Sequence, residues 1–374
     1  MTEEVRIKFH FVTPHPDPLP EGEGEEQMTS IAVKEQIGNA RFQNALAHRA
    51  QSVPPIWLMR QAGRYHRHYQ ALRQKHSFMD LCKQPELAAE VALGPVLDFD
   101  FDAAILFSDL LFPLEALGMG LEYTDGGPQL GWQLNPETIS QLRSVEDAWT
   151  HLLFQGEAMR ATRARLPEDR SLIGFVGGSW TLFVYAVEGS HAGSLTASKK
   201  LLSLFPRFCE VIVPLLARNI ELQLKCGAEL VMIFDTAAGE LTPGVFQAEV
   251  TPQLELLTQN HSTRIGYYSK GTQPAHLRQT LFTGGRLAGV GVDYRWDMAE
   301  ALEMFPRGFV QGNFDQALLL SERDEFKQRL IRYLEPLKEH DRSGWICGLG
   351  HGVLPGTPEE NVRIFVDTVR EVMQ

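Results

Sequence analysis

Short apolar runs recur along the chain, and each is followed by a polar or glycine-rich segment. Runs of four to six residues are too short for a buried helix and are typical of strands that are buried on both faces. The runs are IWLM (56–59), AAILF (103–107), LIGFV (172–176), LVMIF (230–234), RIGYY (264–268), LAGVGV (287–292), FVQG (309–312) and WICGL (345–349).

Segments with helical periodicity separate these runs. They include PELAAEVALGPVLD (85–98) and PEENVRIFVDTVREV (358–372). In the second, Val362, Phe365, Val366 and Val369 form an apolar stripe at helical spacing. Pro358 suits the start of that helix because proline has no N–H that an intrahelical bond would need. The pattern therefore predicts alternating strands and helices.

Eight strand-like runs that alternate with helices predict an α/β fold, a single (β/α)8 barrel with a parallel sheet, over residues 28–374. A doubly wound open sheet is the alternative. The spacing between the first three runs is much longer than a single helix needs, so we expect extra hairpins or helices to decorate the early βα loops.

Residues 1–27 have a different composition from the rest. They hold seven acidic residues against Arg6 and Lys8, which accounts for −5 of the net charge of −12, and the stretch PHPDPLPEGEGEEQ has no apolar periodicity. Such a segment cannot bury enough surface to offset the entropy of ordering it, so we expect a disordered leader. Met28 follows it directly and is an alternative start of the protein.

Composition excludes several classes of protein. The acidic balance argues against a nucleic-acid surface, although clustered arginines can still bind a small anion. No run approaches the ~18 apolar residues of a membrane span, and the chain begins without a signal-peptide pattern. Four distant cysteines without a CxxC pair suggest neither a disulfide framework nor a zinc site, and they favour a reduced, cytoplasmic compartment; they are Cys82, Cys209, Cys226 and Cys347.

In a barrel of this kind the functional residues lie at the carboxyl ends of the strands. The first run is followed by RQAGRY, in which Arg60 and Arg64 flank Gln61, Ala62 and Gly63. On a helical turn this spacing would place both arginines on one side, and paired arginines of this kind bind carboxylate or phosphate. The alternative is that one of them pairs with an acid such as Asp109 and only holds the loop.

Two further strand ends carry ionisable side chains. Asp109 follows a strongly apolar run, so its carboxylate must be either paired or functional. His351 stands between two glycines, and both a structural and a functional role remain open. From the pattern alone, Tyr185 and Thr236 are interpreted as packing residues. Three other acids follow strands at Asp235, Asp293 and Asp315.

Six motifs together make the chain resemble the uroporphyrinogen decarboxylase family from about residue 35 to residue 372. They are PIWLMRQAGRY (55–65), FSDLL (107–111), GFVGGSWTLFVYAVEG (174–189), FDTAAG (234–239), QGNFD (311–315) and LGHG (349–352). The resemblance implies a (β/α)8 barrel, a homodimer, and conversion of the four acetate groups of uroporphyrinogen III to methyl groups without a metal or organic cofactor. The acidic charge and the absence of a long apolar run predict no nucleic-acid or membrane partner.

The resemblance implies a set of substrate contacts. By motif these are Arg60, Gln61, Ala62, Gly63, Arg64, Arg73, Asp109, Tyr185, Thr236 and His351. Asp109 would stabilise the cationic transition state, and Arg60 would bind a carboxylate or donate a proton. Because guanidinium is a weak acid, His351 and Tyr185 are better suited to proton transfer. The chain departs from the family pattern at Arg67, Ser179 and Glu240.

Two other functions stay open from the sequence. Related barrels act as corrinoid-linked methyltransferases with zinc, which would need thiolate and imidazole ligands, and only Cys347 and His351 lie close along the chain. A tetrapyrrole carrier that has kept the pocket without catalysis is the second alternative.

Overall fold

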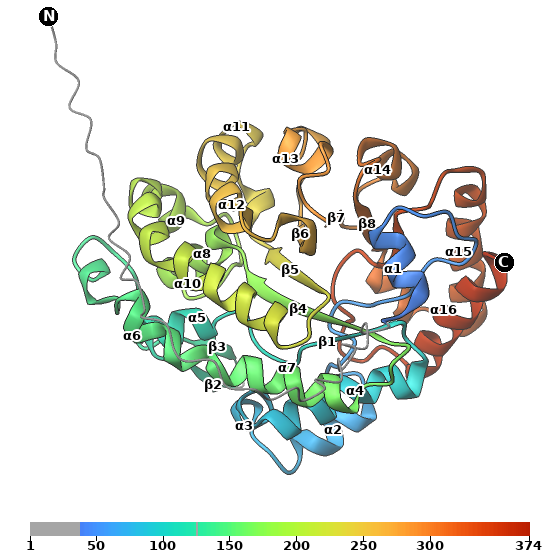
Figure 1. Cartoon of the computed structure of the whole chain (residues 1–374), viewed down its shortest axis with the longest axis horizontal. Coiled ribbons are helices and arrows are strands. Elements are labelled where there is room, and N and C mark those ends of the chain that lie inside the picture. Colours follow the sequence, from blue (N-terminus) through green and yellow to red (C-terminus); the bar gives the residue numbers. More distant parts are fainter. Residues whose placement is uncertain (1–37, 125) are drawn as a thin grey trace, which may run out of the picture. The chain divides into compact units, whose positions relative to one another are not determined.

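The computed structural model describes residues 38–124 and 126–374, and a parallel sheet forms its centre (Figure 1). Seven strands lie in the order β1-β4-β5-β6-β7-β8-β9, so neighbours along the chain are neighbours in the sheet apart from the hairpin β2-β3. The strands are β1 (Ala103–Ile105), β2 (Glu122–Thr124), β3 (Gly127–Gln129), β4 (Ser171–Gly177), β5 (Leu230–Asp235), β6 (Ile265–Ser269), β7 (Gly289–Gly291), β8 (Phe309–Phe314) and β9 (Trp345–Leu349).

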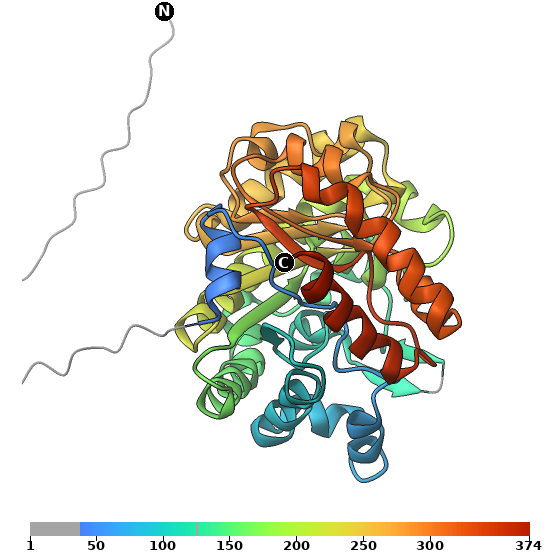
Figure 2. The same ribbon diagram turned by 90° about the vertical axis from the view of Figure 1, so that its right-hand side faces the viewer.

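Helices follow the strands and cover the outside of the sheet, as Figure 1 shows for α8 to α14 along β4 to β8. Their bounds are α1 (Ala40–Leu46), α2 (Arg67–Arg73), α3 (Phe78–Lys83), α4 (Pro85–Phe99), α5 (Phe112–Leu114), α6 (Val145–Trp149), α7 (Leu153–Arg165), α8 (Ser179–Glu188), α9 (Thr196–Lys200), α10 (Phe205–Lys225), α11 (Pro243–Val245), α12 (Thr251–Thr258), α13 (Thr280–Thr283), α14 (Met298–Met304), α15 (Arg323–Leu334) and α16 (Glu359–Val372). In Figure 2, α15 and α16 lie side by side at the end of the chain.

The first apolar run closes the ring of strands, although it forms only one bridge instead of a full strand. Ile56 pairs in parallel with Cys347 of β9. The Cys347 N–H donates to the carbonyl of Pro55 at 2.9 Å, and on the other side the Asp102 N–H donates to the carbonyl of Ile56 at 3.0 Å. The run therefore lies between β9 and the start of β1, where an eighth barrel strand belongs.

The predicted fold class is confirmed, with seven regular strands in place of the eight expected. Each of the other seven runs contains a strand, and all of their carboxyl ends meet on one side, here called the mouth. The expected decoration of the early loops is also present: α2, α3 and α4 precede β1, and the β2-β3 hairpin precedes β4. The predicted leader, residues 1–27, lies outside the described residues.

Burial explains why these segments take their conformations. Every residue of β4 and of β8 is buried, as expected for strands covered on both faces. In α16 the predicted stripe faces inward, with Val362, Phe365 and Val369 fully buried. Pro358 is the N-cap of this helix and the acidic Glu359 is in its first turn, where the helix dipole favours negative charge. No helix in the described part of the chain is long and apolar enough to cross a bilayer.

A buried carboxylate, Asp102, joins the barrel elements at the amino ends of the strands. Its side chain is completely inaccessible to solvent. Its partners are the N–H of Ile56 at 2.7 Å, the amide of Asn39 at 3.0 Å, and the guanidinium groups of Arg41, Arg370 and Arg170 at 3.2, 3.8 and 3.9 Å. Asp102 thus ties the first run to β1, opposite the mouth.

Candidate active site

The loop after the first run holds Arg60 in an unusual conformation. The two arginines do not lie on a helical turn, because α2 begins only at Arg67. Arg60 has a φ of 58°, in the left-handed region that non-glycine residues seldom occupy. Its side chain lies against Gly352, where an added Cβ would come 2.4 Å from Arg60 Cδ. Backbone strain of this kind is typical of functional sites.

Gln61 lies beneath that loop and does not face the mouth. It is fully buried, its amide nitrogen donates to the carbonyl of Ala103 at 2.9 Å, and its amide oxygen accepts from the Leu58 N–H at 3.3 Å. The side chain therefore supports the loop from inside, and the predicted contact of Gln61 with a substrate stays a prediction. Ala62 and Gly63 are only partly buried, so the backbone above Gln61 stays accessible.

Arg64 and Arg73 lie on either side of Tyr69. The charges of both arginines act on the Tyr69 hydroxyl and partly offset the increase in its pKa that burial causes. Arg73 also donates to the carbonyl of His76 at 2.6 Å. Arg60 and Arg64 are exposed, and neither forms an ion pair within residues 38–124 and 126–374. Asp109 therefore does not neutralise Arg60, contrary to the structural alternative.

Asp109 follows β1 and is a half-buried carboxylate with few partners. The Leu111 N–H donates to Asp109 Oδ1 at 2.8 Å. Burial raises the pKa of Asp109, and the hydroxyl of Tyr123, the Leu111 N–H and the charge of Arg60 each lower it. Tyr123 comes from β2, so the decorating hairpin supplies a neighbour of Asp109. A ligand that donates N–H groups would also favour the ionised form.

Tyr185 stands in the last turn of α8 and forms a close pair with His191. Its hydroxyl lies 2.7 Å from His191 Nδ1, and the ring centroids are 5.1 Å apart. Burial and the nearby charge of Asp109 raise the pKa of Tyr185 to about 12, although Arg60 acts in the opposite direction. Tyr185 therefore packs against the hydrophobic core, as its pattern predicts, and also lies close enough to Asp109 to feel its charge.

His351, after β9, is held by Tyr268 from β6. The Tyr268 hydroxyl donates to the carbonyl of Gly350 at 2.8 Å and lies 3.1 Å from His351 Nδ1. Because that hydroxyl has only one proton, the Nδ1–H of a neutral His351 donates to the Tyr268 oxygen and Nε2 is left as an acceptor. The two rings are stacked at 11°.

The pKa of His351 falls to about 3 because of burial, with further decreases from Arg60, Lys270, His191 and Arg295. An unfolded histidine titrates near ~6.5, so between pH 6.5 and 3 the unfolded chain binds more protons than the folded chain. We therefore expect the free energy of unfolding to decrease as the pH falls through that window. Urea unfolding would measure the decrease in the free energy of unfolding between pH 7.5 and pH 5. This decrease should be about 1–2 kcal/mol smaller in His351→Gln than in the wild type. An equal loss in both proteins would contradict the lowered pKa.

Thr236 and the remaining acids at strand ends have different surroundings. Thr236 is half-buried, and its side chain has no hydrogen bond to another described residue. Asp235 is completely buried and accepts from the hydroxyl of Thr181 at 2.6 Å and from the Tyr267 hydroxyl at 3.1 Å. Asp315 caps a 3-10 helix through the Ala317 N–H at 2.9 Å. These two carboxylates are structural.

Cationic side chains surround the two histidines of the mouth. Lys270 follows β6, is half-buried, and has no ion-pair or hydrogen-bond partner among the residues the structure describes. Its charge and that of Arg60 lower the pKa of both His191 and His351. Arg295 is in contrast paired with Asp293 at 2.5 Å. Lys270, His191, Tyr268 and Tyr123 were not among the predicted site residues.

The three departures from the family pattern lie at the edges of this site. Arg67 begins α2 and pairs with Glu359 at 2.8 Å, which links the first loop to α16. Ser179 is a buried first residue of α8, and Glu240 is exposed. None of them replaces a predicted contact.

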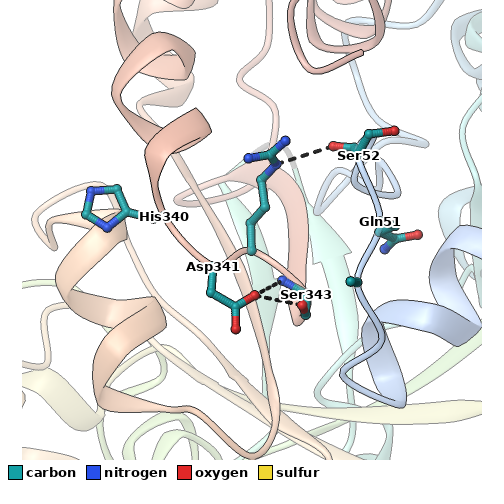
Figure 3. Close-up of a pocket in the computed structure, with 7 residues that line it drawn as sticks. Gln51, Ser52, His340, Asp341 and Ser343 are labelled. Atoms are coloured by element: carbon teal, nitrogen blue, oxygen red, sulfur yellow. Dashed lines mark hydrogen bonds between the residues drawn. The ribbon is translucent and has the colours of Figure 1, made fainter.

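A hollow of about 410 Å³ lies away from the mouth. It is lined by residues 50–52, before the first run, and by residues 340–343, before β9. Figure 3 shows the hydrogen bond that the Ser343 hydroxyl donates to Asp341, with Ser52 and His340 also lining the hollow. A second hollow, of about 720 Å³, is lined by Tyr65, Arg67 and the start of α16. Neither includes Asp109, Tyr185 or His351.

Comparison with known proteins shows the family to which the chain belongs. The family described as uroporphyrinogen decarboxylase (URO-D) matches residues 38–372. A uroporphyrinogen decarboxylase from Solibacter usitatus is 35% identical over 89% of this chain and 97% of its own length. Another, from Francisella philomiragia, is 34% identical over 88% of this chain and 98% of its own length.

A solved structure shares the fold at lower sequence identity. A methyltransferase from Methanosarcina mazei superposes with a TM-score of 0.70 at 18% identity, over 89% of this chain and 98% of its own. This likeness concerns the fold alone, whereas the matches above extend through all the strand-end motifs. The chain therefore belongs to the uroporphyrinogen decarboxylase family.

Proposed function

We propose that this protein is a uroporphyrinogen decarboxylase, which converts the four acetate groups of uroporphyrinogen III to methyl groups and releases coproporphyrinogen III and four molecules of carbon dioxide. One observation carries the proposal. A half-buried carboxylate, Asp109, lies near Arg60, and Arg60, Arg64 and Lys270 have no ion-pair partner among the described residues. This arrangement fits a ligand with N–H donors at its centre and carboxylates at its edge.

The substrate supplies its own electron sink. Protonation of a pyrrole carbon gives a cation, into which the electrons of the breaking C–C bond flow as carbon dioxide leaves. A proton then adds to the former methylene carbon, and the ring proton is lost, so each cycle consumes one proton. The reaction as proposed uses no metal or organic cofactor. The protein must bind the ring, stabilise the cation and transfer protons.

Asp109 would stabilise the cation. Its Oδ2 has no backbone donor, so it can accept from the pyrrole N–H groups while Leu111 holds Oδ1. Because the carboxylate is fixed before the reaction begins, no reorganisation is needed when positive charge develops, and such groups contribute about 3–4 kcal/mol. Rotation of the ring about this aspartate would present the four acetates in turn.

The arginines would bind the peripheral carboxylates. Arg60 and Arg64 are exposed at the mouth, and a guanidinium group forms paired hydrogen bonds with a carboxylate. His351 offers Nε2 as an acceptor while it is neutral, and a carboxylate beside it would raise its low pKa again. Thr236, directly after β5, and Tyr185, in the last turn of α8, would add hydroxyl groups. A cytoplasmic homodimer is part of the proposal and rests on the family resemblance alone.

A turnover assay with metal-free protein tests this function. We expect purified protein, treated with a chelator, to convert uroporphyrinogen III under anaerobic conditions and to release four carbon dioxide molecules per ring. Chromatography of the oxidised products would follow the steps from eight carboxylates to four. Binding of the ring without release of carbon dioxide would instead identify a carrier, and dependence on added zinc would contradict the cofactor-free reaction.

The methyltransferase alternative lacks support from the side chains. Within the described ranges, no group of three or more His, Cys, Asp or Glu residues is arranged to hold a metal ion. Cys347 is fully buried in β9, and burial raises the pKa of its thiol well above the ordinary value, which disfavours the thiolate that zinc requires.

A further inference from the structure

Among the residues that the structure describes, His191 forms its hydrogen bond with Tyr185. Helix α8 ends at Gly189, whose φ of 76° turns the chain, and His191 follows two residues later. The turn brings the imidazole back onto the last turn of α8, where its Nδ1 is 2.7 Å from the Tyr185 hydroxyl. The rings also pack, with centroids 5.1 Å apart. This pair is held by both a hydrogen bond and a ring contact.

The proton of this hydrogen bond belongs to Tyr185. The Tyr185 hydroxyl has no other acceptor among the described residues. Burial lowers the pKa of His191, with further decreases from Lys270 and Arg60, so its imidazole is neutral near pH 7 and offers a lone pair. The Tyr185 O–H therefore donates to Nδ1, and the proton of His191 is on Nε2.

This direction decides what Tyr185 presents to a ligand. A hydroxyl has one proton and two lone pairs, so a proton that points to His191 leaves the lone pairs for the other side. Asp109 lies near that hydroxyl, since its charge contributes to the raised pKa of Tyr185. The lone pairs of the Tyr185 oxygen and the carboxylate of Asp109 would then both present negative electrostatic potential to the ring that becomes cationic. Without His191, the O–H would be free to turn toward Asp109 or the ligand.

We propose that His191 is a positioning residue of the active site, which acts through Tyr185 by fixing its hydroxyl so that the lone pairs face the reacting ring. The inference rests on the proposed decarboxylase function and adds to it a residue that the strand-end motifs do not include. It concerns stabilisation of the cation, which forms only during the reaction. The effect is therefore expected on kcat and much less on KM.

Kinetics of five variants, which are His191→Ala, Tyr185→Phe, the double variant, His191→Asn and His340→Ala, test this role. We expect His191→Ala to lower kcat for uroporphyrinogen III about ten-fold, as for loss of one oriented hydrogen bond, with KM within about two-fold of the wild type. In a Tyr185→Phe background, His191→Ala should change kcat less than about two-fold, because the group through which it acts is gone. His191→Asn, which can place an amide oxygen near the Nδ1 position, should recover kcat to within about three-fold of the wild type. His340→Ala, in the hollow of Figure 3, is the control and should have no effect.

A spectroscopic readout is independent of turnover. Imidazole 15N spectra of the free protein should show His191 neutral, with the proton on Nε2 and Nδ1 accepting a hydrogen bond that Tyr185→Phe removes. The inference would be overturned if the kcat losses of His191→Ala and Tyr185→Phe multiplied in the double variant, or if His191→Asn lowered kcat as much as His191→Ala. The proposed decarboxylase function would stand in either case. If the wild-type protein gave the expected spectra but did not turn over uroporphyrinogen III, the proposed function would be contradicted. The hydrogen bond from Tyr185 to His191 would still be established. Spectra with the proton on Nδ1 would overturn the inference directly.

Discussion

Asp109→Asn is expected to lower kcat for uroporphyrinogen III by about 10²–10³-fold while the protein stays folded. The amide has nearly the same shape, so the Leu111 N–H keeps an acceptor at the same place. The variant loses the negative charge that stabilises the pyrrole cation, and one of its side-chain positions becomes an N–H that cannot accept from the ring. Steady-state kinetics under anaerobic conditions would measure the change.

A matched variant separates this loss from a general effect of removing an acid. Asp297→Asn replaces an exposed aspartate that caps α14 through the Glu300 N–H at 3.0 Å. Asparagine is also a good N-cap, so this variant should retain both turnover and stability. If Asp109→Asn retained full turnover, Asp109 would not be the group that stabilises the cation, and the mechanism would be wrong.

Asp102→Asn is expected to reduce the free energy of unfolding by about 3 kcal/mol, the largest effect on stability that we predict. Asp102 is completely buried and accepts from the Ile56 N–H and from Arg41. A neutral amide would leave Arg41 without its counter-charge, although Arg170 and Arg370 would keep Asp100. Its NH2 group would also face one of the donors from which the carboxylate now accepts. It would also weaken the contact that holds the first run beside β1, and so displace the loop of Arg60.

Asp100→Asn is the control for this prediction. Asp100 shares Arg170 and Arg370 with Asp102, but its side chain is 54% exposed. Exposed ion pairs contribute ~0–1 kcal/mol to stability, and asparagine tolerates the positive φ of this position. The free energy of unfolding of Asp100→Asn should therefore decrease by less than about 1 kcal/mol. Urea unfolding at pH 7.5 would measure both variants. Equal losses would show that the burial of Asp102 does not matter.

The sequence predicts the barrel well because its strands are short, apolar runs whose periodicity does not depend on distant residues. The first run is the exception. Ile56 forms a single bridge to β9, and the turns that carry Arg60 begin only three residues later, at Met59. No local pattern distinguishes such a run from a full strand. The decorating hairpin could be expected from the spacing, but its position beside Asp109 could not.

The candidate site is predicted best where ionisable residues directly follow a strand-like run, as for Arg60, Asp109 and His351; the structure brings their charges within reach of one another. The sequence does not show the buried hydrogen bonds of Gln61 and Asp235, because their partners are distant in sequence: Ala103 for the first, Thr181 and Tyr267 for the second. Tyr123 comes from a hairpin without a motif, and His191 is brought to Tyr185 by a turn at Gly189. Only tertiary structure shows such contacts.

A crystal structure of the complex with coproporphyrinogen III tests the central claim most directly. The account predicts that the four pyrrole N–H groups point toward Asp109, with at least one within hydrogen-bond distance of its carboxylate, and that Arg60 and Arg64 bind propionate groups at the edge of the same ring. A product bound elsewhere, or bound at the mouth with its N–H groups directed away from Asp109, would contradict it.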